Sequence, residues 1–185
     1  IFYGKVPSQA NAEICQIIQD TLVQMNLKKE QFKINIFNRK IIEGLLDELK
    51  IIDVAQRFKV LRSIDKFDRI DKNFEDLLKK ERVDPISGDK IAGANLSDDQ
   101  VSSILEFLKT KDLESLKSKF KNNLQKQGFD ELDEILEILS YKNYLNQVQI
   151  DPTRVRGLNY YDSFVVETTV NFKVKNKQNK LVELG

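Results

Sequence analysis

The sequence contains no histidine among its 185 residues and only one cysteine, Cys15. The missing histidine excludes Ser–His or Cys–His catalysis within this chain, and it excludes metal sites built on imidazole ligands. A single cysteine excludes an internal disulfide and fits a reducing compartment, so we expect a cytoplasmic protein. Because Cys15 lies in an apolar helical pattern, we expect a packed thiol and not a nucleophile.

The chain also lacks an excess of charge and any long apolar run. Its 30 Lys and Arg residues are balanced by 29 Asp and Glu, so no global field draws it to nucleic acid or membrane. No apolar run approaches membrane-spanning length and no signal peptide opens the chain, which predicts no membrane partner. The sequence opens on Ile1 and stops at Gly185, directly after a strand-like segment, so we expect both ends to continue in a longer protein.

The sequence does contain a mixed pattern of strands and helices. In the first fifty residues, apolar spacing predicts a strand at 1–4, an amphipathic helix at 12–25, a strand at 32–36 and a helix at 41–49. Asn38 is placed to cap the last of these helices. This order predicts a mixed α/β core.

From about Val54 the pattern becomes helical. Helices are predicted at 54–64, at 74–78, from Ser97, from Asp112 to a closing Gly128, and at 131–141, with a polar loop at 83–95. Ser97 and Gln100 fit a capping box, and Asp112 fits a helix cap. Strands are expected again from Val148, followed by a polar hairpin turn at 173–180 and a returning strand at 181–184.

One stretch, from Val155 to Glu167, combines features of a binding site. Arg156 and Gly157 come first, and Tyr160 and Tyr161 then lead into a β-type run. A guanidinium, a glycine that allows close approach and two phenols suit an anionic ligand held against an aromatic wall. The same composition also fits a half-buried strand with packed tyrosines and a solvated arginine.

Arg156-Gly-Leu-Asn-Tyr-Tyr161, followed by a hydrophobic strand and Glu167, resembles the second signature peptide of histidyl-tRNA synthetases. The family usually has an acid where Asn159 stands, but the arginine and both tyrosines are kept. Further segments with family resemblance are Ile36-Phe-Asn-Arg-Lys40 and Arg62-Ser-Ile-Asp-Lys-Phe-Asp68, and Ser87-Gly-Asp-Lys90 is similar to the alphaproteobacterial branch. The resemblance covers essentially the whole chain and identifies it as an internal fragment of the catalytic region.

The resemblance implies an α/β (α+β) fold, with part of a class II synthetase antiparallel-sheet core and a helical insertion domain. Residues 1–54 would form the first part of the core, and residues 55–128 the insertion. Residues 129–185 would form the second part of the core with the signature peptide.

The resemblance also implies histidine–tRNA ligase activity, in which L-histidine is activated with ATP to histidyl-adenylate and transferred to tRNA(His). Arg156 would contact the ATP α-phosphate and the histidine carboxylate, and Tyr160 and Tyr161 would line the histidine pocket. The complete enzyme would use ATP and Mg²⁺ and form a homodimer. The fragment alone is expected to be inactive, with no cofactor bound.

The interior of the chain offers weaker candidates. The family's insertion lies near the tRNA acceptor arm, so a basic run could contact tRNA phosphates, but a solvated helix face is the favoured explanation because charge runs on helices are common. The run consists of Lys117, Lys119, Lys121 and Lys126. Asp65, Asp68 and Asp71 alternate with basic residues, which favours salt-linked helix surface over a metal site. Two other functions stay open, a non-catalytic paralogue that regulates histidine biosynthesis and a helical RNA-binding module.

Overall fold

The computed structural model describes residues 7–67, 74–80, 82–83, 90–91, 93–157, 162–175 and 181–183. The helices are α1 (Ser8–Gln24), α2 (Arg39–Glu48), α3 (Val54–Ile64), α4 (Phe74–Lys79), α5 (Asp98–Lys109), α6 (Leu113–Lys119) and α7 (Asn123–Tyr141), with short 3₁₀ turns η1 (Lys29–Gln31) and η3 (Leu145–Gln147). The strands are β1 (Phe32–Asn38), β2 (Arg82–Val83), β3 (Lys90–Ile91), β4 (Val148–Ile150), β5 (Phe164–Val170), β6 (Lys173–Lys175) and β7 (Leu181–Glu183). The strand expected at residues 1–4 lies outside the described residues.

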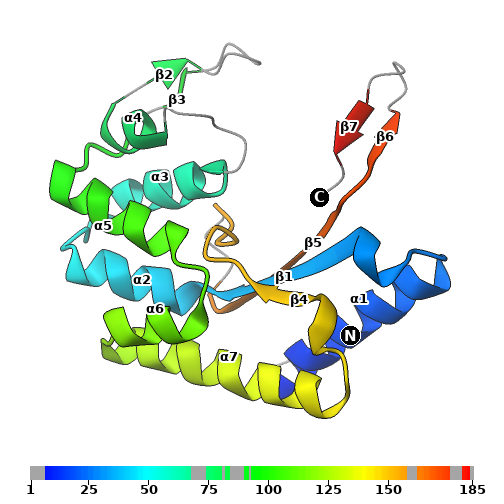
Figure 1. The fold of residues 1–185 in the computed structure, drawn as a ribbon. Coiled ribbons are helices and arrows are strands. Elements are labelled where there is room, and N and C mark those ends of the chain that lie inside the picture. The colour runs from blue at the N-terminus through cyan, green and yellow to red at the C-terminus, as the bar shows by residue number, and fades with distance from the viewer. Residues whose placement is uncertain are drawn as a thin grey trace.

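The fold class predicted from the sequence is confirmed, since a small sheet is combined with many helices (Figure 1). The main sheet has the order β4–β1–β5, with β1 antiparallel to β5 and parallel to β4, so it is mixed. Asn35 of β1 lies in register with Glu167 of β5 and with Gln149 of β4. Because side chains alternate along strands, these three polar residues share one face of the sheet.

The two faces of β1 pack against different helices. Ile34 and Ile36 are fully buried on one face, and Asn38 on that face donates to Glu131 of α7 at 2.6 Å. Phe37, on the other face, packs edge-on against Phe107 of α5, with ring centroids 5.8 Å apart. Figure 1 shows α7 running beneath the sheet and α2, while α3, α4 and α5 gather on the opposite side of α2.

The predicted helix caps are confirmed. Asn38 accepts a hydrogen bond from the Lys40 N–H at 3.0 Å at the start of α2. Ser97 and Gln100 bond each other reciprocally at the start of α5, at 3.3 Å and 3.0 Å. Asp112 accepts from the Ser115 N–H at 2.7 Å at the start of α6. Each cap satisfies backbone donors that the first helical turn leaves free.

The expected helix boundary at Gly128 is wrong. α6 ends at Lys119, and α7 begins at Asn123 and continues through Gly128 to Tyr141. Gly128 serves packing, because a Cβ there would lie 2.7 Å from Cγ1 of the buried Ile41 on α2. The acids from Glu131 onward consequently lie in the middle of α7 and not in its first turn. The division into 1–54, 55–128 and 129–185 stays a prediction, and α7 continues across its second boundary.

Two smaller sheets complete the described structure. β2 and β3 pair antiparallel at the segment expected to be a loop. β6 pairs antiparallel with β7, which confirms the returning strand expected from Leu181, but Lys173–Lys175, expected to lie in the turn, form β6. Figure 1 shows the β6–β7 hairpin projecting away from the helices. Among the described residues, no helix combines the length and apolar character needed to cross a lipid bilayer.

Candidate active site around Arg156

The segment before Arg156 is anchored to the sheet by Asp151. The Asp151 N–H donates to the Ile36 carbonyl of β1 at 3.1 Å. Its carboxylate, on a residue only 3% exposed, accepts from the Thr153 hydroxyl at 2.8 Å and from Arg154 Nε at 3.1 Å. A buried carboxylate that satisfies both a turn and a guanidinium fixes the chain that leads to Arg156.

The backbone at Arg156 adopts an unusual conformation. Its φ is 51°, in the left-handed region that residues other than glycine seldom occupy. The next residue, Gly157, lies against α3, where a Cβ would come within 2.8 Å of Arg62 Cγ and 3.1 Å of Arg62 Cα. The sequence predicted that Gly157 allows a close approach, and the approaching residue is Arg62 of α3, with its side chain nearest and its Cα next.

Among the residues that the structure describes, the Arg156 guanidinium is only partly neutralised. Its Nη2 lies 3.5 Å from Glu167 Oε2, and Arg154 Nη1 lies 3.9 Å from the same oxygen. The Arg156 side chain is 37% exposed, whereas that of Glu167 is 13% exposed. A guanidinium carries five N–H donors, so within the described ranges this single long contact leaves most of them available for an anionic ligand.

A polar floor lies on the sheet face that carries Glu167. Asn35, which is 1% exposed, donates to the Thr169 hydroxyl at 3.1 Å and accepts from the Gln149 side-chain amide. These groups come from β1, β5 and β4 in turn, so pairing of the strands assembles them. The arrangement offers fixed amide and hydroxyl groups next to a cation, which suits a polar, anionic small molecule.

Sequence reasoning found Arg156 but did not single out its surroundings as functional residues. Glu167 stood within the highlighted stretch without a role, and Asn35 was treated as one polar residue of an alternating strand. The sequence signal for Asn35 was an amide set among Phe32, Ile34, Ile36 and Phe37, and the structure shows that this strand is buried along most of its length. The other two predicted pocket residues, Tyr160 and Tyr161, lie outside the described residues.

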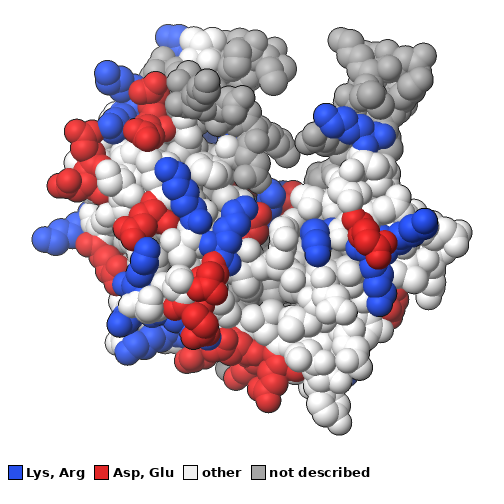
Figure 2. Space-filling model, viewed as in Figure 1, with Lys and Arg blue, Asp and Glu red and all other residues white. Residues whose placement is uncertain are grey.

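The four candidate tRNA-contacting lysines differ in their surroundings. Lys117 lies 2.7 Å from Asp133 and 2.9 Å from Glu114, and Lys119 lies 2.7 Å from Glu106. Burial acts to lower the pKa of Lys117, but its hydrogen bonds to these two acids raise the pKa overall. Lys121 and Lys126 are exposed and make no ion pair within the described part of the chain. Figure 2 shows basic and acidic side chains interleaved over the helices on this face.

No metal site is evident in the ranges that the structure describes, where no group of three or more His, Cys, Asp or Glu side chains is arranged to hold a metal ion. Asp65 is the C-cap residue directly after α3, and Asp68 and Asp71 lie outside the described residues.

Comparison with known proteins supports the family resemblance over most of the chain. A family model described as Histidyl-tRNA synthetase matches residues 2–173. The histidine–tRNA ligase of Pelagibacter ubique is 53% identical over 182 residues, which is 97% of this chain and 39% of that protein. That of Ruegeria pomeroyi is 33% identical over 191 residues, which is 98% of this chain and 38% of that protein. These relatives confirm the likeness to the alphaproteobacterial branch, and the chain spans about two fifths of their length.

Solved structures share the fold. Histidyl-tRNA synthetase from Nostoc sp. PCC 7120 matches with a TM-score of 0.70 and 22% identity, covering 89% of this chain and 37% of that one. A Bacillus halodurans protein titled ATP phosphoribosyltransferase regulatory subunit/histidyl-tRNA synthetase matches with a TM-score of 0.69 and 17% identity, covering 91% and 41%. With a family model that spans most of the sequence, the chain belongs to the histidyl-tRNA synthetase family.

Proposed function

We propose that this chain works as part of a histidine–tRNA ligase, which activates L-histidine with ATP to histidyl-adenylate and then transfers it to tRNA(His). The main observation is that the Arg156 guanidinium contacts Glu167 on the polar sheet face, while most of its donors have no partner among the described residues. The 53% identity to a protein named histidine–tRNA ligase supports the same reading.

In this proposal Arg156 acts on the first step of the reaction. The histidine carboxylate attacks the α-phosphorus of ATP, a new P–O bond forms, and the bond to pyrophosphate breaks. Negative charge shifts among the α-phosphoryl oxygens as this happens. A planar guanidinium can hold the carboxylate and an α-phosphate oxygen together, and it needs no reorganisation as the charge moves. Tyr160 and Tyr161 would border the imidazole, whose donor and acceptor suit phenolic hydroxyls.

Mg²⁺ would reach such a site on the phosphates of ATP. The described residues provide no cluster of three acids for a dedicated cage, and Mg²⁺ in phosphate-transfer sites is commonly held by few carboxylates together with the phosphates. The steps assigned to this chain's residues are therefore binding and orientation of anions.

The decisive experiment is amino-acid-dependent ATP–pyrophosphate exchange. We expect the complete protein to catalyse exchange with histidine and not with other amino acids. The 185-residue chain alone should show none, because it spans about two fifths of the length of its relatives. A complete protein without histidine-dependent exchange would refute the proposal and favour a non-catalytic regulatory paralogue. The fold alone does not separate the enzyme from such a paralogue, because the Bacillus halodurans protein shares it.

We also propose that tRNA, L-histidine and ATP are its partners, that the complete protein is a cytoplasmic homodimer, and that the helical segment meets tRNA. Within the four-lysine run, Lys121 and Lys126 are exposed and better placed to contact phosphates. Lys117 and Lys119 already form ion pairs with acidic side chains.

Replacing Lys121 and Lys126 by glutamine should weaken tRNA binding and reduce the salt slope by about one per lost phosphate contact. Lys29→Gln, which removes an exposed lysine in η1, is the matched control. Equal tRNA affinity in the double variant and the wild type would remove these lysines from the interface.

A further inference from the structure

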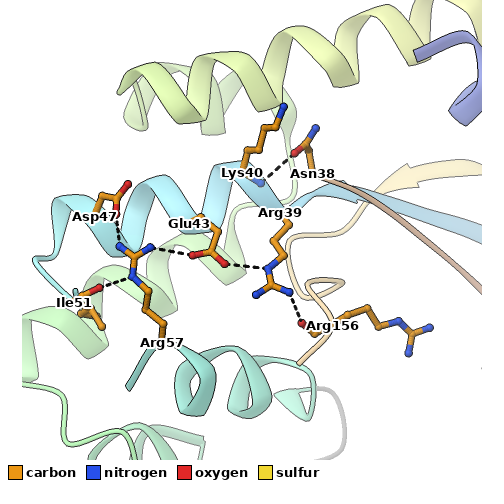
Figure 3. Close-up of polar contacts among 8 residues, drawn as sticks. All are labelled: Asn38, Arg39, Lys40, Glu43, Asp47, Ile51, Arg57 and Arg156. Carbon is orange, nitrogen blue, oxygen red and sulfur yellow. Dashed lines mark hydrogen bonds and ion pairs between the residues drawn. The ribbon is translucent and has the colours of Figure 1, made fainter. Parts of the chain in front are cut away.

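A chain of charged side chains leads from α3 to the backbone of Arg156 (Figure 3). Arg57 of α3 bonds Glu43 of α2 at 3.1 Å, and Glu43 bonds Arg39 Nε at 3.0 Å. Arg39 Nη1 then donates to the Arg156 carbonyl oxygen at 3.5 Å. Figure 3 shows the Arg156 guanidinium pointing away from Arg39, so the two ends of Arg156 make separate contacts.

This chain of side chains, Arg57–Glu43–Arg39, is called the relay below, and it is fixed at the Arg57 end. Arg57 Nε donates to the Ile51 carbonyl at 2.6 Å, and its Nη2 bonds Asp47. Arg57 therefore joins α3 to α2 and to the turn between them. A second tie starts at α2 itself, where the Arg39 N–H donates to the Ser163 carbonyl at 2.8 Å, just before β5. These ties hold α2 and α3 in fixed positions beside the Arg156 segment.

Helix stability does not explain the position of Arg39. It is the first residue of α2, whose first turn contains no acid, and a cation at a helix N-terminus opposes the helix dipole. Its side chain is only 5% exposed, so its charge is largely removed from water. A buried guanidinium is destabilising unless it is paired and hydrogen-bonded, and here its partners include Glu43 and the Arg156 carbonyl.

The Arg156 backbone requires such support. Its left-handed conformation is unfavourable by roughly 1–2 kcal/mol for a residue other than glycine, and it persists only where neighbours determine it. Arg39 holds its carbonyl from one side, and Arg62 of α3, through its side chain and its Cα, confines the following Gly157. The direction in which the Arg156 side chain leaves the backbone depends on this conformation.

We propose that Arg39 is a positioning residue for histidine activation: it holds the Arg156 backbone so that the guanidinium projects over the polar sheet face, and Glu43 and Arg57 couple it to α3. This role rests on the proposed function, since it concerns the same step. Arg39 touches no substrate in this scheme and acts only through Arg156.

The test is the rate of histidyl-adenylate formation in the complete protein carrying Arg39→Met. Displacing a catalytic group by about 1 Å can lower a rate about 100-fold, so we expect a loss of roughly 10- to 100-fold in that rate constant. KM for histidine and ATP should change much less. Arg39→Lys should not rescue the rate, because one ammonium lacks the fork that bonds Glu43 and the carbonyl together.

A double-mutant cycle separates positioning from general stability. If Arg39 acts through Arg156, Arg39→Met should lower the rate no further in an Arg156→Ala background. Lys40→Met is the matched control, because Lys40 is the next residue of α2 and its ion pair is with Glu131 of α7. That variant should keep the wild-type rate whatever its melting temperature.

Arg57→Met covers the case in which Arg39→Met does not fold, because it removes the outer link of the relay and leaves Arg39 in place. It should give a smaller rate loss of the same kind. An active wild type whose rate survives Arg39→Met or Arg57→Met, or a loss that adds to that of Arg156→Ala, would overturn the positioning role. A wild type without histidine-dependent activity would overturn the proposed function, and this role with it.

Discussion

Replacing Asn122 should destabilise the chain more than removing an ordinary helix cap. Asn122 accepts from the Gln125 N–H at 2.9 Å at the start of α7 and donates its amide to the Gly44 carbonyl of α2 at 2.7 Å. Loss of a cap costs about 1 kcal/mol, and loss of the second hydrogen bond about 0.5–1.5 kcal/mol. Asn122→Ala should therefore lower the free energy of unfolding by about 2 kcal/mol.

Ser97→Ala provides the comparison, because Ser97 forms the same type of capping box with Gln100 on α5 and, within the described part of the chain, its side chain bonds no second helix. It should cost about 1 kcal/mol. For a chain of this size the melting temperature falls by roughly 2–4 °C per kcal/mol, so thermal unfolding resolves the two variants.

Asn122→Ser keeps a capping oxygen but cannot reach Gly44, so its stability should fall between that of the wild type and that of Asn122→Ala. Equal losses for Asn122→Ala and Ser97→Ala would show that the bond from α7 to α2 contributes nothing and would refute this reasoning.

Three further outcomes are expected. Gly128→Ala should lower the melting temperature, because its Cβ would lie 2.7 Å from the buried Ile41 and overpacking costs about 1–3 kcal/mol. This cost outweighs the helix preference of alanine over glycine, which is about 1 kcal/mol. A higher melting temperature would contradict the close packing. Hydrogen bonds from Ser115 lower the pKa of Asp112 in the folded state. The stabilisation by this carboxylate is therefore present above the unfolded pKa of about 3.9 and is lost as pH falls through the lower folded value. The difference in unfolding free energy between wild type and Asp112→Ala, measured by urea unfolding, should shrink in acid, and growth of this difference would count against the cap. Burial raises the pKa of Cys15 to about 12, so a thiol reagent at pH 8 should label it only after unfolding, and rapid labelling of the folded chain would show that the thiol is accessible.

Much of the fold could be predicted because its signals are local. The alternating residues of β1 and the caps Asn38, Ser97 and Asp112 mark elements that lie where the sequence places them. Gly128 misled the prediction, since glycine can end a helix or allow close packing, and only the position of Ile41 decides between them. The pairing of β2 with β3 was missed because strands of two residues carry no periodicity.

The candidate site was predictable only at its centre. Arg156 stood in a recognisable string, but Arg39 lies 117 residues away in sequence and reaches it through the packing of α2. Glu167 gained its partner from the register of β5 on β1 and from the turn anchored by Asp151. Such neighbours depend on tertiary structure. The one local hint was a cation at the first position of α2, where helix stability disfavours it.

Histidine-dependent ATP–pyrophosphate exchange by the complete protein carrying Arg156→Lys tests the central claim most directly. Lysine keeps the charge but loses the planar fork, so we predict a loss of about 100- to 1000-fold, or roughly 3–4 kcal/mol of transition-state stabilisation. The melting temperature should barely change, because the side chain is 37% exposed. Transfer from preformed histidyl-adenylate should suffer less. Near-normal exchange with Arg156→Lys, or unfolding of Arg156→Ala, would show instead that this arginine is structural.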